Sequence, residues 1–267
     1  MVGINAVMAS TRSRREPGRS PRPRLRARTQ EHKEVRRRAI LSAASRVFGA
    51  GDYDAITVAQ IAERAGLAKG TVYLYFDTKE ELFLEVAWAR LQEWLAVLDR
   101  GLLALVRAPR RHTVAELVCR TLRPREVLLR TLSLLPNVFE GEVDHAAVAR
   151  FKQLILARVG QTGMILEQAL PFLRAGQGAR VLLSVNAFVI GLWKMAQPGP
   201  AAAQALEDPA LRPLRIDFFV ALEDTVAALL AGIEVRARTR PRPAAPLEGR
   251  PAARAPTRGG RPRARRG

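Results

Sequence analysis

The stretch TVAQIAERAGLAKGTVYLYF, from Thr57 to Phe76, decides the fold of this chain. Its first four residues have the pattern of a capping box, in which Thr57 and Gln60 satisfy each other's backbone N–H groups at a helix start. Gly66 suits the left-handed backbone at the end of that helix. A second short helix follows at once, from about Ala68 to Phe76. The spacing therefore predicts two short helices joined by a tight turn that contains glycine.

Amphipathic helices flank these two short helices on both sides. The helix ahead of them has apolar residues spaced along one helix face, at Ile40, Ala44, Val47 and Phe48, and it ends at Gly49 and Gly51. Behind them, Thr78-Lys79-Glu80-Glu81 is a second capping box that opens a long amphipathic helix, and Pro109 closes it. Strand signals are nearly absent, since no period-2 alternation is sustained. The predicted fold class is all-α.

Basic charge is concentrated at the two ends of the chain. The chain has 267 residues, a net charge of +19 and 48% apolar residues. Residues 1–38 carry 12 basic and 3 acidic side chains, residues 234–267 carry 11 and 2, and the rest is almost neutral. Ends this rich in Arg, Pro, Ala and Gly cannot bury enough apolar area to offset the entropy of ordering. We therefore expect a disordered arm over 1–32 and a disordered tail over 236–267, with Met8 as an alternative start to Met1.

Two short helices behind an amphipathic one have the geometry of a helix-turn-helix, which places its second helix in the DNA major groove. We expect this three-helix, N-terminal DNA-binding domain to span 33–83. The side chains placed to reach base edges or phosphates are those of Lys69, Thr71, Tyr73, Tyr75 and Lys79. Gly70 lets the backbone approach closely. The core that holds the helices together is expected to consist of Ile61, Ala62, Ala65, Leu67, Val72 and Phe76.

The same region also carries a family resemblance. Its residues are Ala39-Ile40-Leu41, Phe48, Tyr53-Asp54-Ala55-Ile56-Thr57, Ile61-Ala62, Ala65-Gly66-Leu67, Lys69-Gly70-Thr71-Val72-Tyr73, Phe76 and Lys79-Glu80-Glu81-Leu82-Phe83. This stretch resembles the DNA-binding region of the tetracycline-repressor (TetR) family of bacterial transcriptional regulators. The resemblance implies an all-helical homodimer that binds a palindromic operator, usually as a repressor, and releases it when a small molecule enters the C-terminal domain. The residues that it implies at DNA are Thr57, Lys69, Gly70, Thr71, Tyr73, Tyr75 and Lys79.

Several residues depart from the family pattern. Ala68 stands where many members have a serine cap, and an alanine cap costs about 0.5–2 kcal/mol. Leu74 and Asp77 stand where aromatic or basic residues are common. Residues 39–83 carry 4 basic and 6 acidic side chains, so the domain is net negative. We therefore hypothesise that the N-terminal arm supplies electrostatic affinity for DNA, through residues that include Arg28, Arg36 and Arg37. The alternative is a solvated tail whose arginines reflect a GC-rich genome.

Residues 84–235 are expected to form the ligand-binding and dimerisation domain. Its predicted helices lie near Val114–Leu122, Arg125–Phe139, His145–Leu170, Gln177–Met195 and Leu211–Ile233. The last two helices carry apolar residues at Trp193, Phe219, Leu222, Val226, Leu229 and Ile233, and we expect them to pair with the partner's in a four-helix bundle. The alternative is that this stripe is core within one subunit. The possible walls of a cavity for a small, apolar effector are Leu128, Leu132, Leu135, Phe151, Ile155 and Met164.

Enzyme functions find little support in the sequence. His32, His112 and His145 are scattered, no pair has metal-ligand spacing, and the single cysteine, Cys119, is more often a buried small hydrophobe than a nucleophile. We expect no metal, no cofactor and no membrane span. The expected location is the cytoplasm. Two functions remain: a ligand-responsive, operator-specific dimer, or an Arg-tailed oligomer that binds nucleic acid or RNA without sequence preference. The pattern from Gly66 to Phe83 favours the first.

Overall fold

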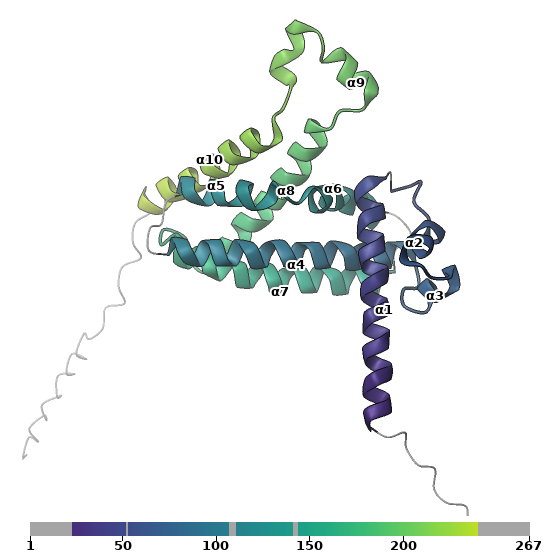
Figure 1. Ribbon diagram of the computed structural model, residues 1–267. Helices are drawn as coiled ribbons and strands as arrows, with labels where there is room; N and C mark the ends of the chain where they lie inside the picture. Colours follow the sequence, from purple (N-terminus) through teal and green to yellow (C-terminus); the bar gives the residue numbers. More distant parts are fainter. Residues whose placement is uncertain (1–22, 52, 107–110, 141–143, 240–267) are drawn as a thin grey trace, which may run out of the picture.

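The computed structural model describes residues 23–51, 53–106, 111–140 and 144–239, and every regular element in these ranges is a helix (Figure 1). The N-terminal domain consists of α1 (Pro23–Ala50), α2 (Val58–Ala65) and α3 (Lys69–Tyr73), and α4 (Lys79–Leu105) joins it to the body. The other helices are α5 (Arg111–Leu122), α6 (Glu126–Glu140), α7 (His145–Ala169), α8 (Gln177–Ala196), α9 (Pro200–Ala205), the 3-10 helix η1 (Pro209–Leu214) and α10 (Phe218–Thr239). The all-α prediction is confirmed.

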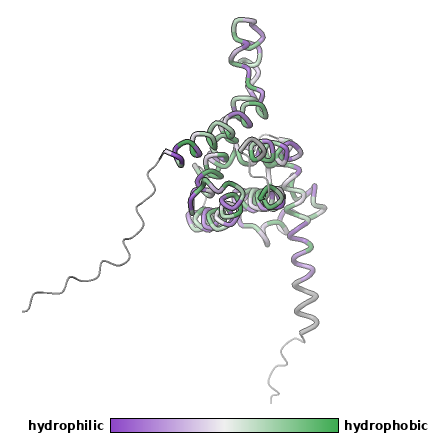
Figure 2. Tube along the Cα trace, turned by 90° about the vertical axis from the view of Figure 1, so that its left-hand side faces the viewer, coloured by the Kyte–Doolittle hydropathy of each residue, from purple (hydrophilic) through white to green (hydrophobic). Residues whose placement is uncertain are grey.

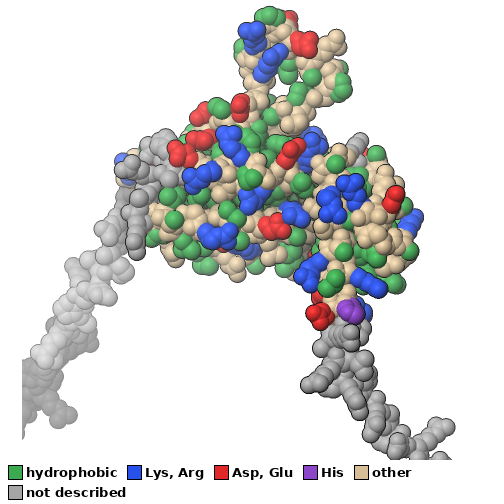
Figure 3. Space-filling view, viewed as in Figure 1, with side chains coloured by type: hydrophobic (Ala, Val, Ile, Leu, Met, Phe, Trp, Pro, Cys, Tyr) green, Lys and Arg blue, Asp and Glu red, His purple; other side chains and the backbone are tan. Residues whose placement is uncertain are grey.

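The body is built around a long pair of helices. Helices α4 and α7 lie side by side, α8 packs across α7, and α10 packs on α5 and α8 (Figure 1). Helix α1 stands across one end of α4 and also contacts α2 and α6. The segment that carries α9 and η1 projects from the body between α8 and α10 (Figures 1 and 3). The N-terminal domain therefore touches the body through α1 and α4.

An aromatic cluster fixes the α1–α2 loop to α4. The Phe48 and Phe83 rings lie edge to face with their centroids 5.0 Å apart, and Tyr53 and Phe83 are also 5.0 Å apart. All three side chains are buried. Such edge-to-face pairs contribute about 0.5–1.5 kcal/mol beyond their buried area. The cluster therefore holds the loop ahead of α2 rigidly against the start of α4.

Two glycines allow α7 and α8 to cross in backbone contact. A Cβ built on Gly178 would overlap the carbonyl oxygen of Gly163, and one built on Gly163 would lie 2.5 Å from the backbone nitrogen of Ala179. Gly176, the residue just before α8, has a left-handed backbone (φ 79°). Gly176 thus ends the turn ahead of α8, and Gly178 in the first turn of α8 permits the close helix crossing.

The N-terminal boundary of α1 differs from the expectation. The expected disorder over 1–32 is wrong for 23–32, because α1 begins at Pro23; residues 1–22 lie outside the described ranges. Proline is favoured at a first helical position, where its missing N–H costs nothing. At the other end, α10 continues to Thr239, past the expected boundary at 235, and the expected tail beyond 239 is not described.

The start of the last long helix also differs. The expected helix over 211–233 is split, because 209–214 form η1 and α10 begins only at Phe218. Asp217 explains the new start, since its side chain accepts hydrogen bonds from the N–H groups of residues 219 and 220, at 3.0 and 3.1 Å. An aspartate cap of this kind ends the preceding segment and begins a new helix. Helix α9 lies between the helices predicted over Gln177–Met195 and Leu211–Ile233, where the sequence predicts none.

Candidate nucleic-acid interface

Helix α2 has the predicted cap at each end. The Thr57 hydroxyl oxygen accepts a hydrogen bond from the Gln60 backbone N–H at 3.3 Å, and the Thr57 N–H donates to Gln60 Oε1 at 2.8 Å. Gly66 has a left-handed backbone (φ 68°), and its N–H reaches the carbonyl oxygens of residues 62 and 63. The Leu67 N–H donates to the Ala62 carbonyl at 2.9 Å. These bonds fix the turn that orients α3.

Helix α3 is anchored on one side and open on the other. Val72 and Phe76 are buried, with 1% and 2% of their surface exposed, whereas Lys69 and Gly70 are exposed and Tyr73 is 42% exposed. Thr71 and Tyr75 are half-buried at the edges of this open side. Ala68, the cap residue of α3, makes no side-chain hydrogen bond, because alanine has no polar side-chain atom. The helix therefore projects a small polar surface away from the core.

Gly70 has no structural role within the protein itself. Its backbone is helical, and a Cβ built on it would meet nothing within 4 Å. Glycine costs a helix roughly 0.5–1 kcal/mol relative to alanine. The free protein therefore has no packing reason to hold a glycine at this exposed position.

Lys79 lies differently from the expectation of a free phosphate contact. Its Nζ donates to the Tyr53 carbonyl at 3.1 Å and lies 4.2 Å from the centre of the Tyr53 ring. The Tyr53 hydroxyl in turn donates to Glu80 Oε1 at 3.1 Å. Burial raises the pKa of that hydroxyl well above its usual range, and the Glu80 carboxylate raises it further. Lys79 thus anchors the α1–α2 loop, a tertiary contact that no local sequence pattern signals.

The cap of α4 is a modified capping box. The Glu81 N–H donates to Thr78 Oγ1 at 3.0 Å, as predicted. The return bond, however, runs from the Asp77 N–H to Glu81 Oε2 at 2.9 Å, one residue earlier than a capping box would have it. The hydrogen bond from the Asp77 N–H to Glu81 thus helps to hold the turn between α3 and α4.

The arm residues are placed unequally. Arg37 pairs with Glu85 of α4 at 2.7 Å, and its guanidinium lies 5.3 Å from the centre of the Phe76 ring, so its expected role as a free arm contact is corrected to a brace between α1 and α4. Arg36 is exposed on α1. Arg28 lies on the helical part of the arm, and its side chain is outside the described residues.

The expected pocket residues are mostly core. Leu128, Leu132, Leu135 and Phe151 are buried. Ile155, the fifth expected wall, is half-buried.

Met164 is corrected, because 59% of it is exposed and it cannot wall a closed cavity. The side chain points outward because the buried positions of this part of α7 are taken by Thr162, Gly163 and Leu166.

The expected dimer stripe divides between core and surface. Leu222 and Val226 are fully buried inside the subunit, as the alternative of a core within one subunit predicts. Phe219, Leu229 and Ile233 are half-buried. Trp193 is buried edge to face against Phe218, with their centroids 5.1 Å apart.

Other reactive groups in the described ranges are confined. No group of three His, Cys, Asp or Glu side chains that could hold a metal occurs in the part of the chain that is described. Cys119 is buried, and burial together with the nearby Glu223 raises its pKa to about 12. Helix α8 is long and apolar enough to cross a membrane by length and composition alone, which is weak evidence for one helix, and it packs against α6, α7 and α10.

The helical fold and the projecting α3 define a helix-turn-helix protein with a helical C-terminal body. Residues 40–86 match the family model of bacterial regulatory proteins, tetR family, and residues 89–237 match that of the tetracyclin repressor-like C-terminal domain. Because the second match spans more than half of the chain, the protein belongs to the TetR family of bacterial regulatory proteins.

Curated relatives match in a limited region. The chain is 39% identical over 73 residues to the uncharacterized HTH-type transcriptional regulator YfiR of Bacillus subtilis, covering 27% of this chain and 36% of that protein. It is 32% identical over 80 residues to the HTH-type transcriptional repressor Rv1474c of Mycobacterium tuberculosis, covering 30% and 43%. The match therefore spans less than half the length of these relatives. A TetR-family regulator structure from Mesorhizobium loti has 19% identity and a TM-score of 0.46, covering 76% of this chain and 96% of that one.

Proposed function

We propose that this protein is a ligand-responsive transcriptional repressor that binds a palindromic DNA operator as a homodimer in the bacterial cytoplasm. The observation that carries the proposal is the open side of α3, where Lys69, Gly70 and Tyr73 are exposed while Val72 is buried. A recognition helix of this kind enters the major groove with its N-terminal residues at the base edges. The vacant space around Gly70 supports a close approach of backbone to DNA.

The remaining contacts are assigned by position. Thr57 is exposed at the start of α2. Phosphate oxygens accept hydrogen bonds, so Thr57 contributes its hydroxyl as a donor; in the free protein this hydroxyl donates to Gln60 Oε1, with the two oxygens 3.3 Å apart. Thr71 and Tyr75 flank the open side of α3 and reach phosphates or base edges. Lys79 contributes through its position at the start of α4, where the first backbone N–H groups favour an anion.

The N-terminal part of α1 supplies the positive charge that the helix-turn-helix lacks. Figure 2 shows the described part of α1 that leaves the body in purple, as a hydrophilic stretch. Arg36 is exposed there, and Arg28 lies further along the same helix. Each phosphate that is neutralised contributes roughly −0.9 to the slope of log K against log salt. Deleting residues 1–30 should flatten that slope by several units per dimer, and an unchanged slope would contradict this role.

The dimer is formed through α8 and α10. Exposed residues, most of them apolar or small, recur every four positions on both helices, at Leu183, Ala187, Gly191, Met195, Val220, Asp224, Ala228 and Gly232. Stripes of this kind suit the close packing of a helix pair against its two-fold copy. Replacing Ala187 with Glu should yield monomers in analytical ultracentrifugation. Replacing the exposed Ala146 of α7 with Glu is the control, and dissociation of that variant instead would contradict the assignment.

The effector is a small, apolar molecule that binds in the body. Leu128, Leu132 and Leu135 of α6 and Phe151 of α7 are buried in the hydrophobic core, and few charges fall in these stretches. Ligand sites are lined mainly by side chains of this kind. A ligand that binds the DNA-free state better than the DNA-bound state releases the operator, because it shifts the population by its difference in affinity.

Selection of bound duplexes from a random pool, followed by competition at physiological salt, tests this function. We expect a short palindrome to bind roughly 10³-fold or more tightly than random duplex. Replacing Lys69 and Tyr73 with Ala should weaken that binding and leave the dimer intact. Replacing the exposed Lys152 of α7 with Ala removes a positive charge elsewhere and is the matched control. Equal binding of all duplexes would instead indicate the Arg-tailed, non-specific binder.

A further inference from the structure

A cleft lies where the DNA-binding domain meets the body. It has a volume of about 530 Å³, and we call it the interdomain cleft. Ser42, Ser45 and Arg46 of α1 form one wall, and Arg90 and Glu93 of α4 form another. The third wall is the turn and first residues of α6, 124–128. The volume lies within the range of sites that hold small molecules.

The carboxylates that line the interdomain cleft are already paired. Glu93 forms an ion pair with Arg90 at 2.9 Å, and Glu126 forms one with Arg130, which lies outside the cleft lining, at 3.1 Å. Neither carboxylate therefore neutralises the other two arginines of the cleft.

Arg46 and Arg125 line the cleft without a carboxylate partner. In the described structure Arg46 donates to the Ser42 hydroxyl at 3.1 Å, and Arg125 donates to the Thr121 carbonyl oxygen. No ion pair of either guanidinium occurs among the described residues. Arginine has five N–H donors in a planar fork, so both side chains keep donors for an anion with several oxygens.

Arg90 adds an unsatisfied donor to the same cleft. Its Nη1 is used by Glu93, but its buried Nε has no hydrogen-bond partner within the described part of the chain. Buried polar groups in proteins nearly always have a partner, which can be water, an ion or a ligand. An anion in the cleft is one way to satisfy this requirement.

We propose that the interdomain cleft binds a small polyanion, a di- or tricarboxylate or a phosphate-bearing molecule. Arg46 and Arg125 bind its charged oxygens from opposite walls, and the Ser42 and Ser45 hydroxyls donate to the same groups. The apolar side chains at 127 and 128 line the remaining surface. This site borders the proposed apolar effector site, with which it shares Leu128, and differs from it in the charge of its ligand.

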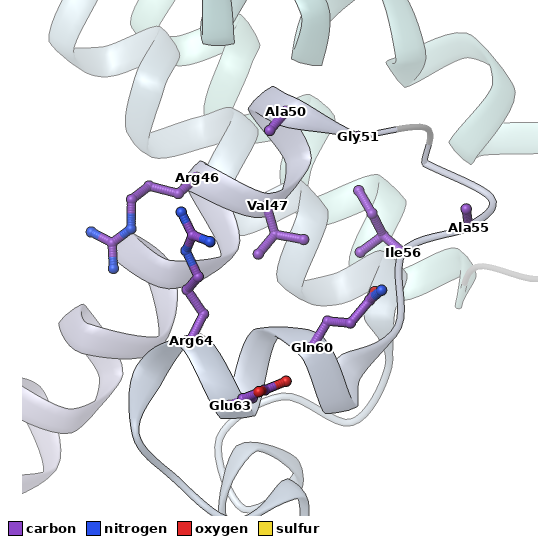
Figure 4. A pocket seen from close by; sticks show the side chains of 9 residues that line it. All are labelled: Arg46, Val47, Ala50, Gly51, Ala55, Ile56, Gln60, Glu63 and Arg64. Carbon is purple, nitrogen blue, oxygen red and sulfur yellow. The ribbon is translucent and has the colours of Figure 1, made fainter.

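A neighbouring hollow between α1 and α2 is the competing position for an anion. It has a volume of about 490 Å³ and shares Arg46 with the interdomain cleft. Figure 4 shows Arg46 and Arg64 at the same end of this hollow, with Glu63 on the helix below. Glu63 forms no ion pair among the described residues, so its negative charge lowers the attraction for an anion. The paired carboxylates make the interdomain cleft the stronger candidate.

An anion in this cleft ties α1 of the DNA-binding domain to α4 and α6 of the body. Its effect on DNA binding rests on the proposed function and requires that the cleft differ between the DNA-bound and free states. Binding of the anion is therefore measured first, in the absence of DNA. A failure of the site and a failure of the repressor function are then distinguishable.

The test is isothermal titration of the full chain with citrate and, separately, with pyrophosphate, at about 0.15 M salt to screen the basic ends. We expect saturable binding of at least one of the two anions. Replacing Arg125 with Gln should weaken the binding of the anion about tenfold or more, because a hydrogen bond to a charged group is lost. Replacing Arg64 with Gln, which leaves the cleft intact, should change it less than about twofold. The thermal midpoint of each variant without anion checks that it is folded.

Each other outcome has a definite meaning. If neither anion binds, or if Arg125→Gln leaves binding unchanged, the site does not exist. If Arg64→Gln abolishes binding instead, the anion occupies the α1–α2 hollow. If Arg125→Gln weakens DNA binding in the absence of anion while no anion binds, the guanidinium contacts DNA phosphate. Should Arg125→Gln fail to fold, Ser42→Ala replaces it, with loss of affinity expected and equal affinity overturning the proposal.

Discussion

Replacing Gly70 with Ala separates the stability of α3 from its proposed contact with DNA. A Cβ at this position meets nothing within 4 Å, and the backbone is helical, so the free protein accommodates the methyl group without strain. Alanine is favoured over glycine inside a helix by roughly 0.5–1 kcal/mol. Gly70 is the second residue of α3, so we expect the lower end of this range, a gain of about 0.5 kcal/mol in the free energy of unfolding.

DNA affinity should change in the opposite direction. A methyl group on the exposed side of the recognition helix occupies the space that a close approach to the duplex requires. We expect the selected palindrome to bind at least about tenfold more weakly, which corresponds to about 1.4 kcal/mol. Urea denaturation measures the stability, and fluorescence anisotropy with the labelled palindrome measures the affinity.

Gly160→Ala is the matched control, because Gly160 also lies in a helix, α7, and a Cβ there also meets nothing within 4 Å. This variant should gain stability and keep its DNA affinity. If Gly70→Ala keeps full affinity, the open side of α3 is not at the DNA surface at that position. If Gly70→Ala loses stability instead, the close-approach argument has no basis, since the glycine would then be required by the fold.

Three further predictions concern the body and the loop that supports α2. Replacing Asp99 with Ala should cost about 3 kcal/mol of stability in urea denaturation, because Arg158, which pairs with it at 2.6 Å, is left largely buried without its partner. Replacing Gly178 with Ala should cost about 1–3 kcal/mol in the same assay, because the methyl group would overlap the Gly163 carbonyl. Tyr53→Phe should make stability less dependent on pH above about 10. The folded-state pKa of Tyr53 is raised, so its contribution is present below the unfolded pKa and is lost as the pH rises toward the folded pKa.

Each of these changes has a control or a contrary outcome. The exposed Glu116 of α5, replaced with Ala, should alter stability by no more than about 0.5 kcal/mol. A loss for Asp99→Ala no larger than that would mean that the ion pair contributes little. A stable Gly178→Ala would mean that α7 and α8 can separate without cost. An unchanged pH dependence in Tyr53→Phe would place the titration that destabilises the protein at another group.

The local helix signals of the DNA-binding domain could be predicted from the sequence. The bonds between Thr57 and Gln60, and the left-handed backbone of Gly66, involve residues within a few positions of each other, so the chain itself encodes them. The burial of Val72 beside the exposed Lys69, Gly70 and Tyr73 follows from the helical period in the same way. Sequence spacing is sufficient for these features because the residues that form them are near neighbours in the chain.

The misplaced residues depend on partners that are distant in the chain. Lys79 binds the carbonyl of Tyr53, and Arg37 pairs with Glu85, and in both cases the side chain is taken up by another element. Their positive charge alone suggests a DNA contact, because the sequence does not reveal which cations have a tertiary partner. The same limit applies to Met164, whose apolar character does not indicate which face of α7 it occupies.

The tertiary contacts of Lys79 and Arg37 limit which positive charges of the protein can attract DNA. Lys79 is held by the Tyr53 carbonyl, so the net negative domain over 39–83 offers one free positive group fewer than the sequence suggests, and just outside it Arg37 is paired with Glu85. Arg46, Arg64 and Lys69 remain exposed there, and three cations per subunit neutralise few phosphates and so release few counterions. The additional charge must come from outside the domain. We propose that helix α1 carries it, because its N-terminal part is helical and continuous with the domain that holds α3.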